Sequence, residues 1–180
     1  QCLSTTVWNG VMWSNGAPNV TTTAIINAPY NVGFSPSIQC CDLIVNSTLT
    51  INNNGFVTFQ DDVSGIGNIL VRSGGRFIPV NDWSTCNNNN ITIERTTSSL
   101  KQFDYVYFSS PTTNTIIGNT LANWNPDRTF TFNGQDFIDL ETNYQGNFIS
   151  NIPDGQDDSS PSPWILSDFT NTFNTGVGYP

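Results

Sequence analysis

The chain has no histidine, one lysine (Lys101) and four arginines among its 180 residues. Most catalytic sites need a base that titrates near neutral pH, a cationic group that binds an anion, or a nitrogen ligand for a metal. This chain offers almost none of these groups. Their scarcity disfavours catalysis and favours a structural or binding module.

Positive charge is too scarce for two classes of partner. The net charge is −9 and the isoelectric point is about 4.1. Nucleic acids and anionic membranes are bound largely through Lys and Arg. A membrane helix needs about 20 apolar residues in a row, and this sequence has no such run. We therefore expect neither nucleic-acid binding nor membrane insertion. The first residue is Gln1, which we interpret as a mature N-terminus after signal removal or as the start of a fragment.

Helix-forming patterns are also missing. The sequence has four alanines and one methionine, and no helical spacing of apolar residues runs free of Gly, Pro or β-branched residues. It is rich instead in Asn (25), Thr (22), Gly (14) and Pro (10). Strand-like segments of three to five residues recur between polar turns. They cover residues 23–26, 43–45, 49–51, 56–59, 69–71, 77–80 and 91–93.

The spacing of these segments predicts the architecture. Between residues 40 and 95 they recur every six to ten residues, separated by turns such as 52–55 and 73–75 in which Asn and Gly supply positive φ. Such short strands form either the rungs of a β-solenoid or a hairpin-linked sandwich. The single apolar pairs, the small polar corners and the lack of two-residue hairpins of the Asn-Gly type favour the solenoid. We predict an all-β fold, with a short β-solenoid (or sandwich) over residues 1–95.

Residues 96–180 differ in character and predict a second β subdomain packed on the first. Strand patterns cover residues 103–108, 129–132 and 164–166, and an acidic loop rich in Pro and Ser covers 150–163. Residues 176–179 resemble the start of a strand, and the sequence ends before this strand would be complete. An unfinished strand leaves an edge that another copy of the chain, or a neighbouring domain, would complete, and a filament is one such assembly.

The cysteines are Cys2, Cys40, Cys41 and Cys86. Without histidine, a zinc site would need all four thiolates, and the CxxC spacing that such sites favour is absent. We therefore predict two disulfides formed in an oxidising compartment. Cys40 and Cys41 point to opposite faces if they lie on a strand, so one is expected to pair with Cys2 and the other with Cys86. Which pairs with which stays open.

Three segments resemble a known group of proteins. The first is Trp8-Asn9-Gly10-Val11-Met12-Trp13-Ser14-Asn15-Gly16-Ala17-Pro18, the second is 103–111, and the third is 176–179. They are similar, in the same order, to W-N-G-x-x-W-S-N-G-x-P, Y-x-Y-x-Y-W-S-S-P and G-x-G-Y segments of large Bacteroidetes proteins exported by the type IX secretion system. The resemblance implies a β-rich module of an adhesin-like protein at the cell surface or released from it. It implies no catalytic residues, and the sorting domain of those proteins is missing here.

Calcium is the metal that the acidic segments fit best. Asp154, Asp157 and Asp158 offer hard oxygen ligands in one loop, although without the spacing of an EF-hand. Asp61 and Asp62 form a second candidate. The alternative is an exposed acidic loop without a metal. We expect no other cofactor.

Sugar binding is the main functional alternative. Trp124 and Trp83 lie in polar segments, and Asp127 follows Trp124 closely. A tryptophan ring stacks on a pyranose while amides and carboxylates bind its hydroxyls, although most tryptophans only pack in a core.

Carboxylate pairs such as Asp136 with Glu141 would suit a polysaccharide-degrading enzyme, which the missing bases disfavour. The sequence thus predicts a non-catalytic, extracellular structural or adhesive module. Its partners would be other copies of the chain or neighbouring domains of a surface protein, and glycans if the alternative holds.

Overall fold

The computed structural model describes residues 1–33, 37–87, 90–101, 104, 106–120, 125–137 and 162–174. The chain divides into two compact units, Gln1–Ser98 and Ser99–Pro180. The division expected from the sequence lies at residue 95. Among the described residues no helix has the length and apolar character needed to cross a bilayer.

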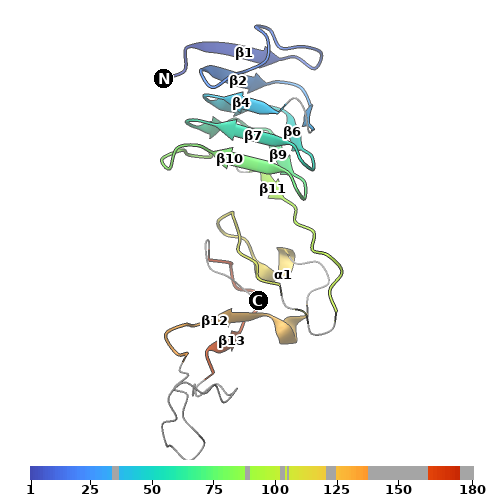
Figure 1. The fold of residues 1–180 in the computed structure, drawn as a ribbon, viewed down its shortest axis with the longest axis vertical. Coiled ribbons are helices and arrows are strands. Elements are labelled where there is room, and N and C mark those ends of the chain that lie inside the picture. Colours follow the sequence, from blue (N-terminus) through green and yellow to red (C-terminus); the bar gives the residue numbers. More distant parts are fainter. Residues whose placement is uncertain are drawn as a thin grey trace, which may run out of the picture. The chain divides into compact units, whose positions relative to one another are not determined.

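The first unit is a β-solenoid built from three parallel sheets, as the stacked arrows in Figure 1 show. The first sheet contains β1 (Ser4–Trp8), β2 (Thr22–Ile26), β5 (Leu43–Val45) and β8 (Val63–Ser64). The second contains β3 (Tyr30–Val32), β6 (Thr48–Ile51), β9 (Asn68–Val71) and β11 (Ile91–Ile93). The third contains β4 (Ile38–Cys40), β7 (Phe56–Phe59) and β10 (Arg76–Pro79). The solenoid prediction is therefore confirmed over the sandwich alternative.

The chain visits the three sheets in turn, so each coil places one strand in each sheet. In the second sheet Tyr30 pairs with Leu49, and Leu49 pairs with Ile69. In the third sheet Ile38 pairs with Val57, and Val57 pairs with Phe77. In both sheets, paired residues of successive rungs are separated along the chain by nearly the same number of residues. One rung is therefore about 20 residues long, at the short end of the repeats that solenoids use and longer than the strand spacing noticed in the sequence.

The core consists of aliphatic columns that run along the solenoid. Alternate residues of each strand point inward, because side chains of a strand alternate between its faces. The strands β2, β4, β5, β6 and β7 accordingly alternate buried with more exposed positions. The fully buried large side chains of this unit are Ile26, Val32, Ile38, Leu43, Val45, Leu49, Ile51, Val57, Val63, Ile69 and Val71.

The corners between sheets need residues that tolerate positive φ. Asn54 and Gly74 occupy equivalent positions in successive rungs and both adopt positive φ, 63° and 83°. The amide of Asn54 donates to the carbonyl of Gly74 at 3.2 Å, which joins the two rungs at this corner. Gly55 and Gly75 follow at equivalent positions, and a Cβ on Gly75 would lie 2.7 Å from the carbonyl oxygen of Ile51. These turns are the ones that the sequence pattern indicated.

Three aromatic rings pack on the core near the first rung. Trp8, Trp13 and Tyr30 contact one another, with ring centroids 4.7–5.7 Å apart, and pack against the buried aliphatic residues. The indole Nε1 of Trp8 donates to the carbonyl of Pro29 at 3.1 Å. The conspicuous W-N-G-x-x-W segment thus contributes its two tryptophans to the packing of the solenoid.

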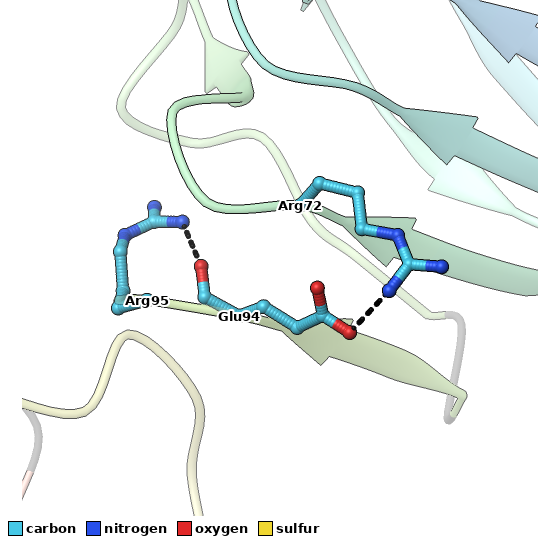
Figure 2. A network of polar contacts seen from close by, with 3 residues as sticks. All are labelled: Arg72, Glu94 and Arg95. Carbon is cyan, nitrogen blue, oxygen red and sulfur yellow. Dashed lines mark hydrogen bonds and ion pairs between the residues drawn. The ribbon is translucent and has the colours of Figure 1, made fainter. Parts of the chain in front are cut away.

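The last rungs are joined by an ion pair. Arg72 follows β9 and Glu94 follows β11, and the Arg72 Nη1 lies 2.7 Å from the Glu94 Oε1 (Figure 2). Arg95 Nη1 donates to the Glu94 carbonyl at 2.8 Å. Both side chains of the ion pair are about half exposed, so its contribution to the free energy of unfolding is about 0–1 kcal/mol.

The second unit contains α1 (Ile117–Thr120), the 3-10 helix η1 (Pro126–Arg128), β12 (Phe130–Phe132) and β13 (Trp164–Leu166). β12 and β13 pair antiparallel, and the rings of Phe132 and Trp164 lie 4.7 Å apart. These strands fall within the expected segments 129–132 and 164–166. The expected strand at 176–179 lies outside the described residues, as do Phe103 and Tyr105 of the segment 103–108.

Candidate functional site

The described residues of the solenoid gather sulfur, carboxylate and an exposed indole at one corner, where the chain passes from the third sheet to the first. We call it the acidic corner. It comprises Cys2, Cys41, Asp42, Asp61, Asp62, Asn81, Trp83 and Thr85. Because Leu43 pairs with Val63 in the first sheet, the preceding residues Asp42 and Asp62 occupy equivalent positions. The segment 80–85 forms the same corner one rung later.

One disulfide links Cys2 to Cys41, with the Cα atoms 5.5 Å apart. It ties the segment that precedes β1 to the turn between β4 and β5, and Cys41 is only 3% exposed. Cys40 is the last residue of β4, Cys41 follows the strand, and both residues are buried. The pairing that the sequence left open is resolved in favour of Cys41 as the partner of Cys2.

The expected second disulfide between Cys40 and Cys86 is absent. Cys40 is a buried thiol whose Sγ donates to the carbonyl of Thr58 at 3.6 Å, whereas Cys86 is exposed. Cys40 is at the end of β4 and points into the solenoid core, which excludes it from a bridge to a surface loop. Burial, together with the nearby charge of Asp42, raises the pKa of the Cys40 thiol to about 12.

Two carboxylates face the two disulfide sulfurs. Asp42 Oδ2 lies 3.0 Å from Cys2 Sγ, and Asp61 Oδ2 lies 3.6 Å from Cys41 Sγ. One ligand atom from each of these four residues lies within 4.8 Å of the others. A disulfide sulfur carries no proton, so both are close sulfur–oxygen contacts and not hydrogen bonds.

The second oxygen of each carboxylate is held by the neighbouring rung. Asp42 Oδ1 accepts from the backbone amide of Asp62 at 3.2 Å, and Asp61 Oδ1 accepts from Asn81 Nδ2 at 3.3 Å. These bonds fix the orientation of both carboxylates toward the sulfurs. Asp61 and Asp62 are a possible calcium site on the sequence alone. Asp42 is not evident there, although the rung repeat makes it the equivalent of Asp62.

The Asp62 side chain instead binds the segment 80–85 of the next rung. Its Oδ1 accepts from the amide and the hydroxyl of Thr85 at 2.9 and 2.8 Å. These two hydrogen bonds lower the pKa of the Asp62 carboxyl, the backbone bond being the larger cause. A general acid needs a raised pKa, so the lowered pKa of Asp62 does not suit that role.

Trp83 projects from the same corner. Its side chain is 73% exposed, and its loop is held by Asn81 Nδ2 and Ser84 Oγ, which donate to the carbonyl of Gln60 at 2.6 and 3.0 Å. Two separate sequence candidates, Trp83 for sugars and Asp61 with Asp62 for a cation, thus lie at one corner.

The other candidate residues all belong to the second unit. Asp127 is exposed in η1, where its amide donates to the Asn125 side chain at 3.0 Å. Asp136 accepts from Asn133 Nδ2 at 2.6 Å and so closes a local turn. Trp124, Glu141, Asp154, Asp157 and Asp158 lie outside the described residues.

Comparison with known proteins gives one match. No curated protein and no solved structure matches the chain. A family model described as Domain of unknown function (DUF8693) matches residues 3–179, a range that runs through both units. The chain therefore belongs to the DUF8693 family.

Proposed function

We propose that the chain is a non-catalytic, extracellular structural or adhesive module of a cell-surface protein. The Bacteroidetes type IX-exported proteins that its sequence resembles are the proposed setting. Neighbouring domains or further copies of the chain are the proposed partners.

The observation that carries this proposal is the structural use of the carboxylates. Asp62 is bonded to Thr85 and Asp168 to Thr170, and in both cases the hydrogen bonds lower the carboxyl pKa. Glu94 pairs with Arg72 across rungs. Carboxylates that fix turns and stay ionised suit a scaffold, whereas acid–base catalysis needs one whose pKa lies near the working pH. The disulfide is consistent with an oxidising compartment.

The test combines location and activity. Antibodies against the chain should label intact cells, and the purified chain should release neither reducing ends nor unsaturated products from a panel of polysaccharides. Labelling that appears only after the cells are permeabilised would contradict the location. Product release that an Asp136→Asn substitution abolishes would contradict the non-catalytic role.

Carbohydrate binding is the second candidate, and the exposed Trp83 favours it. An indole two residues after Asn81, whose side chain bonds to Asp61, combines a stacking surface with groups that bind hydroxyls. Under this alternative the chain is retained on a glycan, and Trp83→Ala lowers the affinity at least about tenfold. The matched control is Ile66→Ala, because Ile66 is the exposed apolar residue of another corner. Equal retention of both variants would exclude Trp83 as the platform.

A further inference from the structure

The disulfide in the acidic corner leaves two anionic oxygens without a donor. Asp42 Oδ2 and Asp61 Oδ2 both face sulfur atoms that carry no proton. Among the described residues no hydrogen-bond donor reaches either oxygen. Asp42 and Asp61 are both intermediate in exposure.

Hydrogen bonds from the neighbouring rung fix the orientation of these two carboxylates. Asp42 is held through its Oδ1 by the Asp62 amide, and Asp61 is held through its Oδ1 by Asn81. Metal ligands are commonly fixed in this way by hydrogen bonds from a surrounding shell. The two Oδ2 atoms are therefore preorganised toward the position of the sulfurs.

Reduction changes the chemistry of this corner. A phosphine reductant supplies two electrons and takes the oxygen of one water to become a phosphine oxide, while the sulfur–sulfur bond breaks and the two hydrogens of that water complete two thiols. When Cys2 and Cys41 then lose their protons, two thiolates and two carboxylates share one small volume. Four negative charges at this separation repel one another strongly unless a cation neutralises them.

We propose that the dithiol form of the chain binds one zinc-class divalent cation through Cys2, Cys41, Asp42 and Asp61. Binding displaces the two thiol protons. Reoxidation by a disulfide oxidant, which accepts the two electrons and becomes two thiols with two protons from solvent, re-forms the Cys2–Cys41 disulfide and expels the cation. Two thiolates favour zinc over calcium or magnesium, which take oxygen ligands. The inference concerns the reduced chain, whereas the proposed scaffold role concerns the oxidised chain, so each can fail without the other.

The geometry requires a modest local movement. Zinc–sulfur bonds of about 2.3 Å in a tetrahedral site place the two sulfurs about 3.8 Å apart, and the carboxylate oxygens lie at about 2.0–2.2 Å from the ion. Cys2 is half-buried and precedes β1, so its side chain can rotate without disturbing a strand. A zinc site expected from thiolate ligands alone leaves out a site that two carboxylates complete.

The test uses the whole chain with Cys86→Ser, which removes the exposed thiol. After reduction with a phosphine, Zn²⁺ is titrated against a chromophoric chelator, and Co²⁺ is added separately as a spectroscopic probe. We expect one Zn²⁺ per chain, thiolate-to-cobalt charge-transfer absorption with the visible bands of a tetrahedral ion, and release of Zn²⁺ when a disulfide oxidant is added. The oxidised chain should bind no Zn²⁺ at this site.

Asp42→Asn and Asp61→Asn should each weaken Zn²⁺ binding at least about tenfold. Asp82→Asn is the matched control, because it removes the same charge from an exposed side chain of the neighbouring segment 80–85; its affinity should change less than about threefold. Equal losses in all three variants, or no stoichiometric binding to the reduced chain, would overturn the proposal.

Circular dichroism covers the case in which the reduced chain unfolds. Zn²⁺ should then restore the strand signal in the parent chain but not in the variant with both Asp42→Asn and Asp61→Asn. Recovery in both chains, or in neither, would also overturn the proposal.

Discussion

At the scale of single residues, the corner glycines are the positions with least room. A Cβ on Gly75 would lie 2.7 Å from the Ile51 carbonyl oxygen and 3.0 Å from that of Arg72, both of them backbone atoms. We expect Gly75→Ala to lower the free energy of unfolding by about 2–4 kcal/mol, because two rungs must move apart. Urea denaturation followed by tryptophan fluorescence measures the change.

Gly33→Ala is the control for this substitution, because a Cβ there meets nothing within 4 Å. Its free energy of unfolding should change by less than about 1 kcal/mol. Similar losses for the two variants would show that the rungs are not held together as closely as the structure places them.

The buried thiol of Cys40 predicts a dependence of stability on alkaline pH. Its folded pKa of about 12 lies above the ordinary value of 9.0, so the folded chain holds a proton that the unfolded chain loses. The contribution to stability is fully present below about pH 9 and is lost as the pH rises toward 12. In this window the loss should be about 1.4 kcal/mol per pH unit.

Cys40→Ala isolates that contribution, because the other alkaline titrations are shared by both proteins. The difference in free energy of unfolding between the parent and the variant should shrink as the pH is raised from 8 to 10.5 in denaturant titrations. A difference that stays constant over this range would mean that Cys40 is not buried as a thiol.

At the scale of strands, the inward and outward faces of one rung predict opposite sensitivities. Leu49 and Thr50 are neighbours on β6, and Leu49 is fully buried in its column while Thr50 is not. We expect Leu49→Ala to cost about 2–5 kcal/mol in free energy of unfolding and Thr50→Ala less than about 1 kcal/mol. Comparable costs from guanidinium titrations would contradict the register of β6 between β3 and β9.

The strands of the solenoid could be predicted where they are apolar and not where they are polar. Segments such as 43–45 and 56–59 carry Val, Ile, Leu or Phe at inward positions, and the structure places β5 and β7 there. β1 is rich in Ser and Thr, and β4 ends in cysteine, so neither showed an apolar pattern. Their strand state comes from pairing with the next rung, which is a long-range effect.

The acidic corner was predictable only in fragments. Asp61, Asp62 and Trp83 stood out as local clusters, but Cys2 and Asp42 come from other rungs. Coils of slightly different length bring them together. This near-repeat is obscured by its changing length and by the replacement of Asn54 by Gly74 at the equivalent corner. The pairing of Cys2 with Cys41 likewise needed the fold.

At the scale of the whole molecule, the disulfide closes a loop of 39 residues around the first rungs. A link of this length contributes about 4 kcal/mol when its effect is attributed to the entropy of the unfolded chain. We expect Cys2→Ser to lower the free energy of unfolding of the oxidised protein by about 2–4 kcal/mol. Chemical denaturation of the two proteins measures the difference. A change below about 0.5 kcal/mol, the size expected of an ordinary surface substitution, would contradict a structural role for this link.

The solenoid structure and the proposed extracellular role both require a Cys2–Cys41 link in the native protein. The most direct test of this link is a non-reducing peptide map of the protein isolated from its own cells, with new thiols blocked at lysis and Cys40 and Cys41 distinguished by fragmentation. We expect a Cys2–Cys41 link, with Cys40 recovered as a thiol. Recovery of both Cys2 and Cys41 as blocked thiols, or a link from Cys2 to Cys40, would contradict this expectation.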